Sequence, residues 1–121
     1  MTEGLPFNIV DMEDHIREAG NELQWYCHEI ARYKGWWEED KNDGEAIALM
    51  HSELSEALEG LRKPGPSDKI PEFSQVEEEL ADTVIRIMDY CEARKLRLYD
   101  AIIAKCEFNL GREYRHGGKK F

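Results

Sequence analysis

Hydrophobic residues recur at helical spacing in four stretches of the chain, and two of these stretches carry a long apolar stripe. One stripe consists of Ile47, Met50, Leu54, Leu58 and Leu61, and the other of Val76, Leu80, Val84, Ile87 and Cys91. Steps of three and four residues place side chains on one face of an α-helix. No run of alternating β-branched residues, which would indicate a strand, extends beyond a few positions. The pattern therefore predicts an all-α protein.

Capping residues, glycines and prolines set the expected ends of four helices. A first helix is expected over about 11–34, because Gly35 follows it in a C-cap position. Asn42 with Glu45, and Ser74 with Glu77, have the spacing of capping boxes, which predicts helices over about 42–61 and 74–95. Residues 62–73 hold three prolines and must form a loop, and a fourth helix is expected over about 98–110. We therefore predict a four-helix bundle in one domain over residues 1–121, with a flexible basic tail from about residue 111.

The composition is that of a soluble globular protein. Of the 121 residues, 35% are charged and 41% are hydrophobic, and the mean hydropathy is −0.68. No apolar run approaches the about 18 residues of a spanning helix, and the first residues lack the basic and apolar regions of a secretory signal. Cys27, Cys91 and Cys106 are odd in number and have no CxxC spacing. We therefore expect reduced thiols, buried as small hydrophobes, in a cytoplasmic protein.

Charge is distributed unevenly along the chain. The net charge of −10 argues against a protein that binds DNA or RNA polymers, because such a surface should be basic. The last residues, in contrast, carry Arg112, Arg115, Lys119 and Lys120 against Glu113. Such cationic side chains donate charge-assisted hydrogen bonds to phosphate oxygens. An acidic body with a basic tail favours a small polyanion held through a metal, and we expect neither a nucleic acid polymer nor a membrane as a partner.

Two pairs of carboxylates stand at helical spacing on the flanks of the two apolar stripes. Glu53 and Glu56 lie three residues apart on the second expected helix, and Glu79 and Asp82 lie three residues apart on the third. The Cβ atoms of such a pair are about 5–6 Å apart, so each pair can bind one cation. Two such helices side by side would surround the cation with carboxylate oxygens, the ligands that Mg²⁺ and Mn²⁺ prefer. A solvated acidic face would explain one pair alone, but two pairs together favour a metal site.

Aromatic, histidine and further acidic residues need separate interpretation. Trp36 and Trp37 are adjacent, so both cannot face one core from regular structure. Either one of them stacks on a nucleobase, or they close the end of the bundle or form an oligomer contact. His28 has no partner at ligand spacing, so we expect it in a surface or capping role. We expect Asp89, two turns after Asp82, to face solvent.

The acidic segments resemble the two motifs of the MazG-like all-α nucleoside triphosphate pyrophosphohydrolases, which are E-E-x-x-E on one helix and E-x-x-D on the next. Here the first segment reads Ser52-Glu53-Leu54-Ser55-Glu56, and the second reads Glu79-Leu80-Ala81-Asp82. Ser52 stands where the family has its first Glu, which leaves acidic positions enough for one well-held metal. The closing stretch Lys105-x-x-x-Asn109-x-x-Arg112-x-Tyr114-Arg115-His116 is similar as well, so the resemblance covers about residues 25–120.

The resemblance implies hydrolysis between the α- and β-phosphates of a nucleotide, which yields a monophosphate and pyrophosphate. The implied ligands of Mg²⁺ are Glu53, Glu56, Glu79 and Asp82. Glu53 or Glu56 would also orient or deprotonate the attacking water. Lys105 would contact a phosphate, and Asn109 a phosphate, sugar or base. Arg112 and Arg115 of the tail would add phosphate contacts. The family further implies an assembly, either a homodimer or a homotetramer.

Two other functions are compatible with the same residues. One is a relative with a different substrate, such as the phosphoribosyl-ATP pyrophosphatase of histidine synthesis. The other is a non-catalytic helical interaction module whose acidic face binds a partner. A di-iron carboxylate bundle is disfavoured because it needs Glu-x-x-His pairs, and neither Glu53 nor Glu79 has a histidine three residues later.

Overall fold

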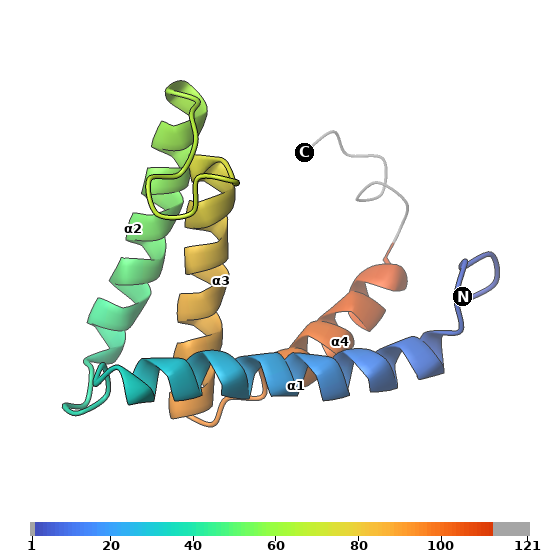
Figure 1. The fold of residues 1–121 in the computed structure, drawn as a ribbon. Coiled ribbons are helices and arrows are strands. Elements are labelled where there is room, and N and C mark those ends of the chain that lie inside the picture. Colours follow the sequence, from blue (N-terminus) through green and yellow to red (C-terminus); the bar gives the residue numbers. More distant parts are fainter. Residues whose placement is uncertain (1, 113–121) are drawn as a thin grey trace. The chain divides into compact units, whose positions relative to one another are not determined.

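The structure is a computed structural model that describes residues 2–112, and within these residues it contains four helices and no strand (Figure 1). The helices are α1 (Ile9–Tyr33), α2 (Asp43–Arg62), α3 (Gln75–Ala93) and α4 (Leu98–Leu110). The only β-type pairing in this part of the chain is an isolated bridge between Pro66 and Ser74. The all-α prediction is confirmed, and the predicted helix ends lie within about two residues of the observed ones.

Local side-chain and backbone contacts explain where the helices begin and end. Gly35 has a positive φ of 83°, its N–H donates to the carbonyl of Arg32, and the N–H of Trp36 donates to the carbonyl of Ala31. These two bonds form a Schellman motif, which closes α1. At the start of α3, the Ser74 side chain accepts from the N–H of Glu77 and the Glu77 side chain accepts from the N–H of Ser74. The predicted capping box at Ser74 is therefore confirmed.

The described residues divide into two compact units, each of which we treat separately. The hairpin unit comprises Leu23–Leu96, and the terminal unit comprises the residues up to Glu22 together with those from Arg97 onward. Helix α1 contributes its first part to the terminal unit and its second part to the hairpin unit. A compact unit is not by itself an independently folding domain, so the prediction of a single domain stays a prediction.

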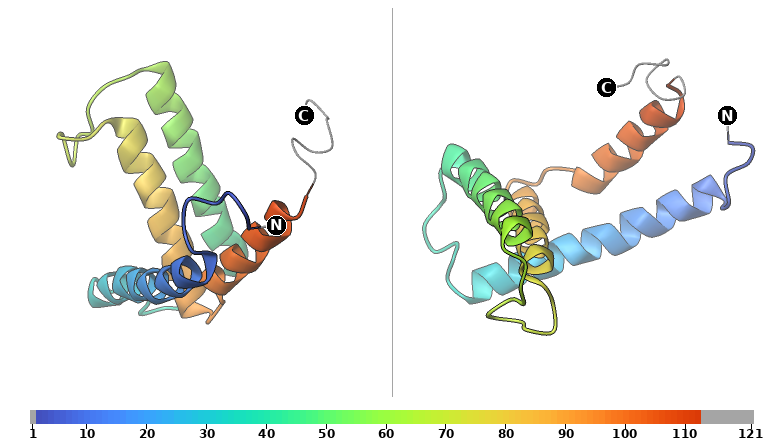
Figure 2. Two further views of the ribbon diagram at one scale, coloured as in Figure 1. Left: turned by 90° about the vertical axis from the view of Figure 1, so that its right-hand side faces the viewer. Right: turned by 90° about the horizontal axis from the view of Figure 1, so that it is seen from above.

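In the hairpin unit, α2 and α3 lie side by side and run in opposite directions (Figures 1 and 2). The second part of α1 crosses the end at which α2 begins and α3 ends, where Gln24 donates a hydrogen bond to Glu92 at 3.0 Å. Near the other end, the contact between α2 and α3 is close. A Cβ atom at Gly60 would lie 3.2 Å from Cγ2 and 3.3 Å from the backbone nitrogen of Val76, so glycine permits this approach.

The face of α2 that packs in the hairpin unit consists of small residues. Its buried residues are Ala46, Ala57 and Gly60. Four residues of its predicted apolar stripe are instead exposed, namely Ile47, Leu54, Leu58 and Leu61. On α3, Leu80 and Val84 are exposed as well. The apolar stripe of α2 is therefore not the packed face of that helix. Small residues form the packed face instead, because they let the two helix backbones approach closely.

In the terminal unit, α4 packs on the first part of α1. The guanidinium of Arg17 donates to Asp100 with a distance of 2.9 Å between Nε and Oδ1. An apolar cleft of about 260 Å³ lies between these segments and is lined by residues that include Met12, Ile103 and Cys106. The prediction of buried thiols is confirmed for Cys27 and Cys91, but it is wrong for Cys106, which is exposed along this cleft.

None of the helices in residues 2–112 combines the length and the apolar character that a membrane-crossing segment needs.

Candidate metal centre

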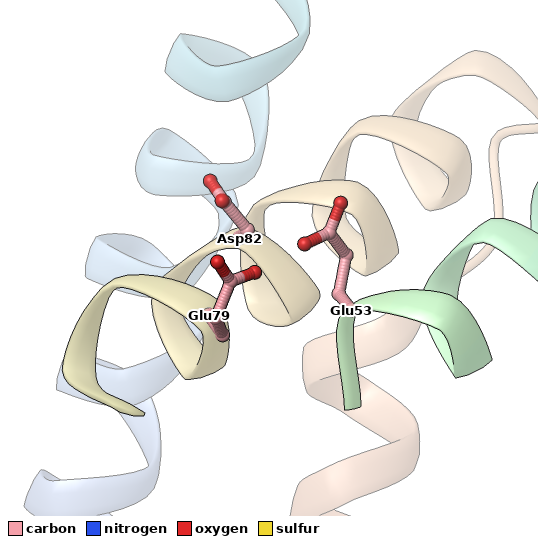
Figure 3. A group of neighbouring side chains, drawn as sticks. All are labelled: Glu53, Glu79 and Asp82. Atoms are coloured by element: carbon pink, nitrogen blue, oxygen red, sulfur yellow. The ribbon is translucent and has the colours of Figure 1, made fainter. Parts of the chain in front are cut away.

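Three carboxylates from two helices converge in the hairpin unit. Glu53 comes from α2, and Glu79 and Asp82 come from successive turns of α3 (Figure 3). Each offers one oxygen, and these oxygens all lie within 4.8 Å of one another. Because α2 and α3 are adjacent, the side chain of Glu53 reaches the face on which Glu79 and Asp82 stand three residues apart. The two helices thereby hold three acidic groups against one small volume.

The proximity of these carboxylates makes them hard to ionise together. The pKa of Glu79 is raised to about 8, first because Glu79 shares a hydrogen bond with Glu53, then because it is buried, and further because of Glu78. The pKa of Asp82 is raised as well, mainly by burial and then by the charges of Glu53 and Glu78. A shared proton partly relieves this repulsion in the absence of a cation. The three carboxylates therefore need more positive charge beside them before all of them can ionise.

Arg86 supplies part of the missing positive charge. Its Nε donates to Oε1 of Glu53 at 3.0 Å, and both side chains are largely withdrawn from solvent. Arg86 lies one turn after Asp82 on α3, so the guanidinium stands on the same side of the helix as the carboxylates. One arginine cannot balance three carboxylates, so the group retains a net negative charge.

The chemistry of this donor set fits a hard divalent cation. All three ligands are carboxylate oxygens, which suit Mg²⁺ and Mn²⁺ rather than softer metals. Two oxygens on opposite sides of one Mg²⁺ lie about 4.2 Å apart, since each bond is about 2.1 Å long. The three oxygens lie within 4.8 Å of one another, which is close to that limit. A cation would also remove the repulsion that raises the pKa values of Glu79 and Asp82.

The fourth predicted ligand, Glu56, is not part of this group. It is exposed on α2, one turn beyond Glu53, and the structure brings together only Glu53, Glu79 and Asp82. A side chain three residues from Glu53 stands about 60° further round the helix, so Glu56 does not share the position of Glu53. The role of Glu56 as a ligand stays a prediction.

A pocket of about 320 Å³ in the hairpin unit joins the carboxylates to several cationic residues. Two of the three carboxylates, Glu53 and Asp82, form part of its wall. The cationic residues that line it are Lys34, Lys41, Lys69 and Arg86, and Trp36 lines it as well. None of these four cationic residues was predicted for the site from the sequence. Arg86 could have been found, because it follows Asp82 by four residues, whereas the others come from helix ends and loops.

The two tryptophans have different environments. Trp36 is 57% exposed and lines the pocket, whereas the indole Nε1 of Trp37 donates to Oδ1 of Asp89 at 2.8 Å. Nδ1 of His28 lies 2.7 Å from the same oxygen. The prediction that Asp89 and His28 lie at the surface was wrong. A carboxylate that accepts two hydrogen bonds can be buried, and Asp89 is buried. The prediction that the two adjacent tryptophans do not both face one core is confirmed. A stacking role for Trp36 stays a prediction.

The remaining predicted substrate contacts belong to the terminal unit or lie outside the described residues. Lys105 and Asn109 are exposed on α4, and Nζ of Lys105 lies 4.6 Å from the ring centre of Phe108. The guanidinium of Arg112 lies 6.0 Å from the same ring centre. Arg115 is outside the described residues. Their roles toward a substrate stay predictions.

Comparison of the chain with protein-family models, curated proteins and solved structures finds no match. The chemistry of the carboxylates and of the pocket beside them is therefore what indicates a function.

Proposed function

We propose that this protein is a Mg²⁺-dependent nucleoside triphosphate pyrophosphohydrolase, the activity that the resemblance to the MazG-like family implies. One observation carries the proposal. Two of three convergent carboxylates, Glu53 and Asp82, border a pocket that also contains four cationic side chains and an exposed indole. A metal-bound polyphosphate and a base require these three kinds of group.

The carboxylates of Glu53, Glu79 and Asp82 would hold Mg²⁺ or Mn²⁺. When bound, such an ion neutralises phosphate oxygens and makes the phosphorus atom easier to attack. Glu79 must lose its proton before it can act as a ligand. Glu56, exposed one turn from Glu53, is free of the three-carboxylate group, so we assign to it the orientation and deprotonation of the attacking water.

The substrate would lie along the pocket. The indole of Trp36 offers a flat apolar surface for a base, and such stacking contributes about 1–3 kcal/mol. Lysine and arginine side chains on the pocket wall would bind phosphate oxygens through charge-assisted hydrogen bonds. Lys105, Asn109, Arg112 and Arg115 are part of the proposal as further substrate contacts, on the strength of the family resemblance alone.

The proposal includes a homodimer or homotetramer in the cytoplasm. Support for assembly comes from the exposed apolar stripe of α2, since monomeric proteins rarely expose contiguous apolar patches of this kind. Support for a reducing compartment comes from Cys27, Cys91 and Cys106, which form no disulfide among the described residues.

Pyrophosphate release tests the proposal directly. Purified protein is incubated with each common (d)NTP and with phosphoribosyl-ATP, with Mg²⁺ or with a chelator, and the products are separated. We expect a monophosphate and pyrophosphate in equal amounts, only with the metal, and no activity in the D82N variant. Cleavage of phosphoribosyl-ATP alone would identify the alternative substrate. Metal-independent product, or none with any nucleotide, would contradict the proposal and favour the interaction module.

A further inference from the structure

The loop between α2 and α3 is fastened to α3 by one buried hydroxyl group. Ser67 is 2% exposed, whereas its neighbours Pro66 and Asp68 are exposed. The Ser67 hydroxyl donates to Oε1 of Glu78 at 2.7 Å. Oγ of Ser67 in turn accepts hydrogen bonds from the backbone N–H groups of Lys69 and Ile70 at 3.2 Å and 3.0 Å. Ser67 thus uses its donor and both acceptor positions, which fixes the backbone of the next residues.

This fastening brings Lys69 to the wall of the pocket that Glu53 and Asp82 border. The hydrogen bond from Ser67 is the main cause of the lowered pKa of Glu78, and the charge of Lys69 adds to it. The same charge opposes the rise in the pKa of Asp82 that burial causes. In the described residues, the lysines and arginines of the hairpin unit that form ion pairs are Arg32, Arg62, Lys63, Arg86 and Arg94, but not Lys69. Among residues 2–112, Lys69 therefore lines the pocket without a carboxylate at ion-pair distance.

We propose that Lys69 binds the polyphosphate of the substrate and that Ser67 is its positioning residue, acting through Glu78. This inference rests on the proposed function, which supplies the polyphosphate. A lysine has a long flexible stem, so a fixed backbone is the main way to direct its ammonium group to one place. Glu78 precedes the candidate ligand Glu79 on α3, so the loop and the carboxylates are held by neighbouring residues of one helix.

Lys63 provides a matched control. It belongs to the same connection and carries the same charge, but its side chain is 84% exposed and pairs with Glu59 at 3.6 Å. Replacing Lys63 removes one positive charge from the loop without touching the pocket. A difference between the two lysines therefore reports on position and not on net charge.

The experiment measures binding of inorganic tripolyphosphate with Mn²⁺ by calorimetry, because this readout does not require turnover. We expect K69A to weaken tripolyphosphate binding about tenfold or more, K69R to restore most of it, and K63A to change it less than about twofold. The melting temperature should stay unchanged in K69A. If turnover is present, KM for the nucleotide should rise with little change in kcat.

A double-mutant cycle tests the role of Ser67. S67A should weaken tripolyphosphate binding severalfold, and S67A combined with K69A should be no weaker than K69A alone, because a positioning residue has no effect once its target is gone. Additive losses, an equal loss in K63A, an unchanged K69A, or no binding of tripolyphosphate by the native protein would each overturn the inference. Tripolyphosphate binding that depends on Lys69 without any nucleotide hydrolysis would instead contradict the proposed function alone.

Discussion

The indole nitrogen of Trp37 and the carboxylate of Asp89 are joined by a hydrogen bond of 2.8 Å, which links the segment after α1 to α3. The same Asp89 oxygen lies 2.7 Å from Nδ1 of His28, whose ring meets that of Trp37 edge-on with 5.6 Å between ring centres. His28, Trp37 and Asp89 are not neighbours in the sequence, but their polar groups satisfy one another inside the hairpin unit.

The D89A variant should be less stable than the native protein. It leaves the buried N–H of Trp37 and the ring nitrogen of His28 without their acceptor, and a buried unsatisfied polar group costs about 1–3 kcal/mol. Urea unfolding followed by tryptophan fluorescence measures the loss. D68A, in an exposed loop position, serves as the control and should be neutral. Equal stability of D89A and the native protein would show that this cluster contributes nothing.

Substitutions of Asp82 and of Glu56 should affect metal binding and catalysis differently. D82N removes one of the three converging ligands, so it should weaken Mn²⁺ binding at least about tenfold, or about 1.4 kcal/mol. E56Q should leave Mn²⁺ affinity within about twofold while it lowers kcat about a hundredfold, since general-base assistance contributes about 10²–10⁴ in rate. Calorimetry and initial rates provide the two readouts. Loss of Mn²⁺ affinity in E56Q would make Glu56 a fourth ligand instead.

The raised pKa of Glu79 predicts a dependence of stability on pH. Its pKa rises from an ordinary 4.5 to about 8 in the folded protein, so folding favours the protonated form. This stabilising contribution is fully present below about pH 4.5 and is lost as the pH rises through about 8. The melting temperature of the metal-free protein should therefore fall between about pH 4.5 and pH 8, and E79Q should show a smaller fall.

Metal should reverse this trend, because a cation competes with the proton on Glu79. Mn²⁺ affinity should increase over the same pH range, and binding near pH 7 should release protons, as detected by calorimetry in two buffers of different ionisation enthalpy. A metal affinity that does not change with pH would show that Glu79 is not a ligand.

The exposed apolar stripe predicts self-association. Ile47, Leu54 and Leu58 are each at least 43% exposed on α2. A second copy of the chain would bury this stripe, and a charged residue there would oppose assembly. We expect a native mass of a dimer or tetramer in light scattering and a lower mass for L58K. E45K adds the same residue on another face of α2 and should leave the mass unchanged. A monomeric native protein would contradict the prediction.

Local patterns made the helices predictable. Gly35 and Ser74 act through bonds to residues a few positions away, so their effect is visible in the sequence. The apolar stripe of α2 shows which side of that helix is hydrophobic, but not which side meets α3. Ala57 and Gly60 make that contact because of their small size, and no hydrophobic periodicity reveals such a preference.

The candidate site was predictable only in part, because contacts with distant segments do not show in the spacing along one helix. Glu53, Glu79 and Asp82 follow from helical spacing once two helices are placed side by side. Asp89 was misplaced because its partners come from α1 and from the segment after it, which spacing along α3 does not show. Lys69 depends on a loop whose path is set by a single hydroxyl group.

The missing side chain at Gly60 has a consequence for which ions this protein can accept. Gly60 lies two turns from Glu53, about 10 Å along α2, and Val76 lies one turn before Glu79 on α3. In a G60A variant the new methyl group would meet the backbone nitrogen of Val76 at 3.3 Å, so the helices would have to separate by a few tenths of an ångström. Ca²⁺ takes bonds of about 2.3–2.6 Å where Mg²⁺ takes about 2.1 Å, so the wider spacing would favour the larger ion. Under the proposed function, a glycine that touches none of the three carboxylates would thus set the size of ion that the two helices suit.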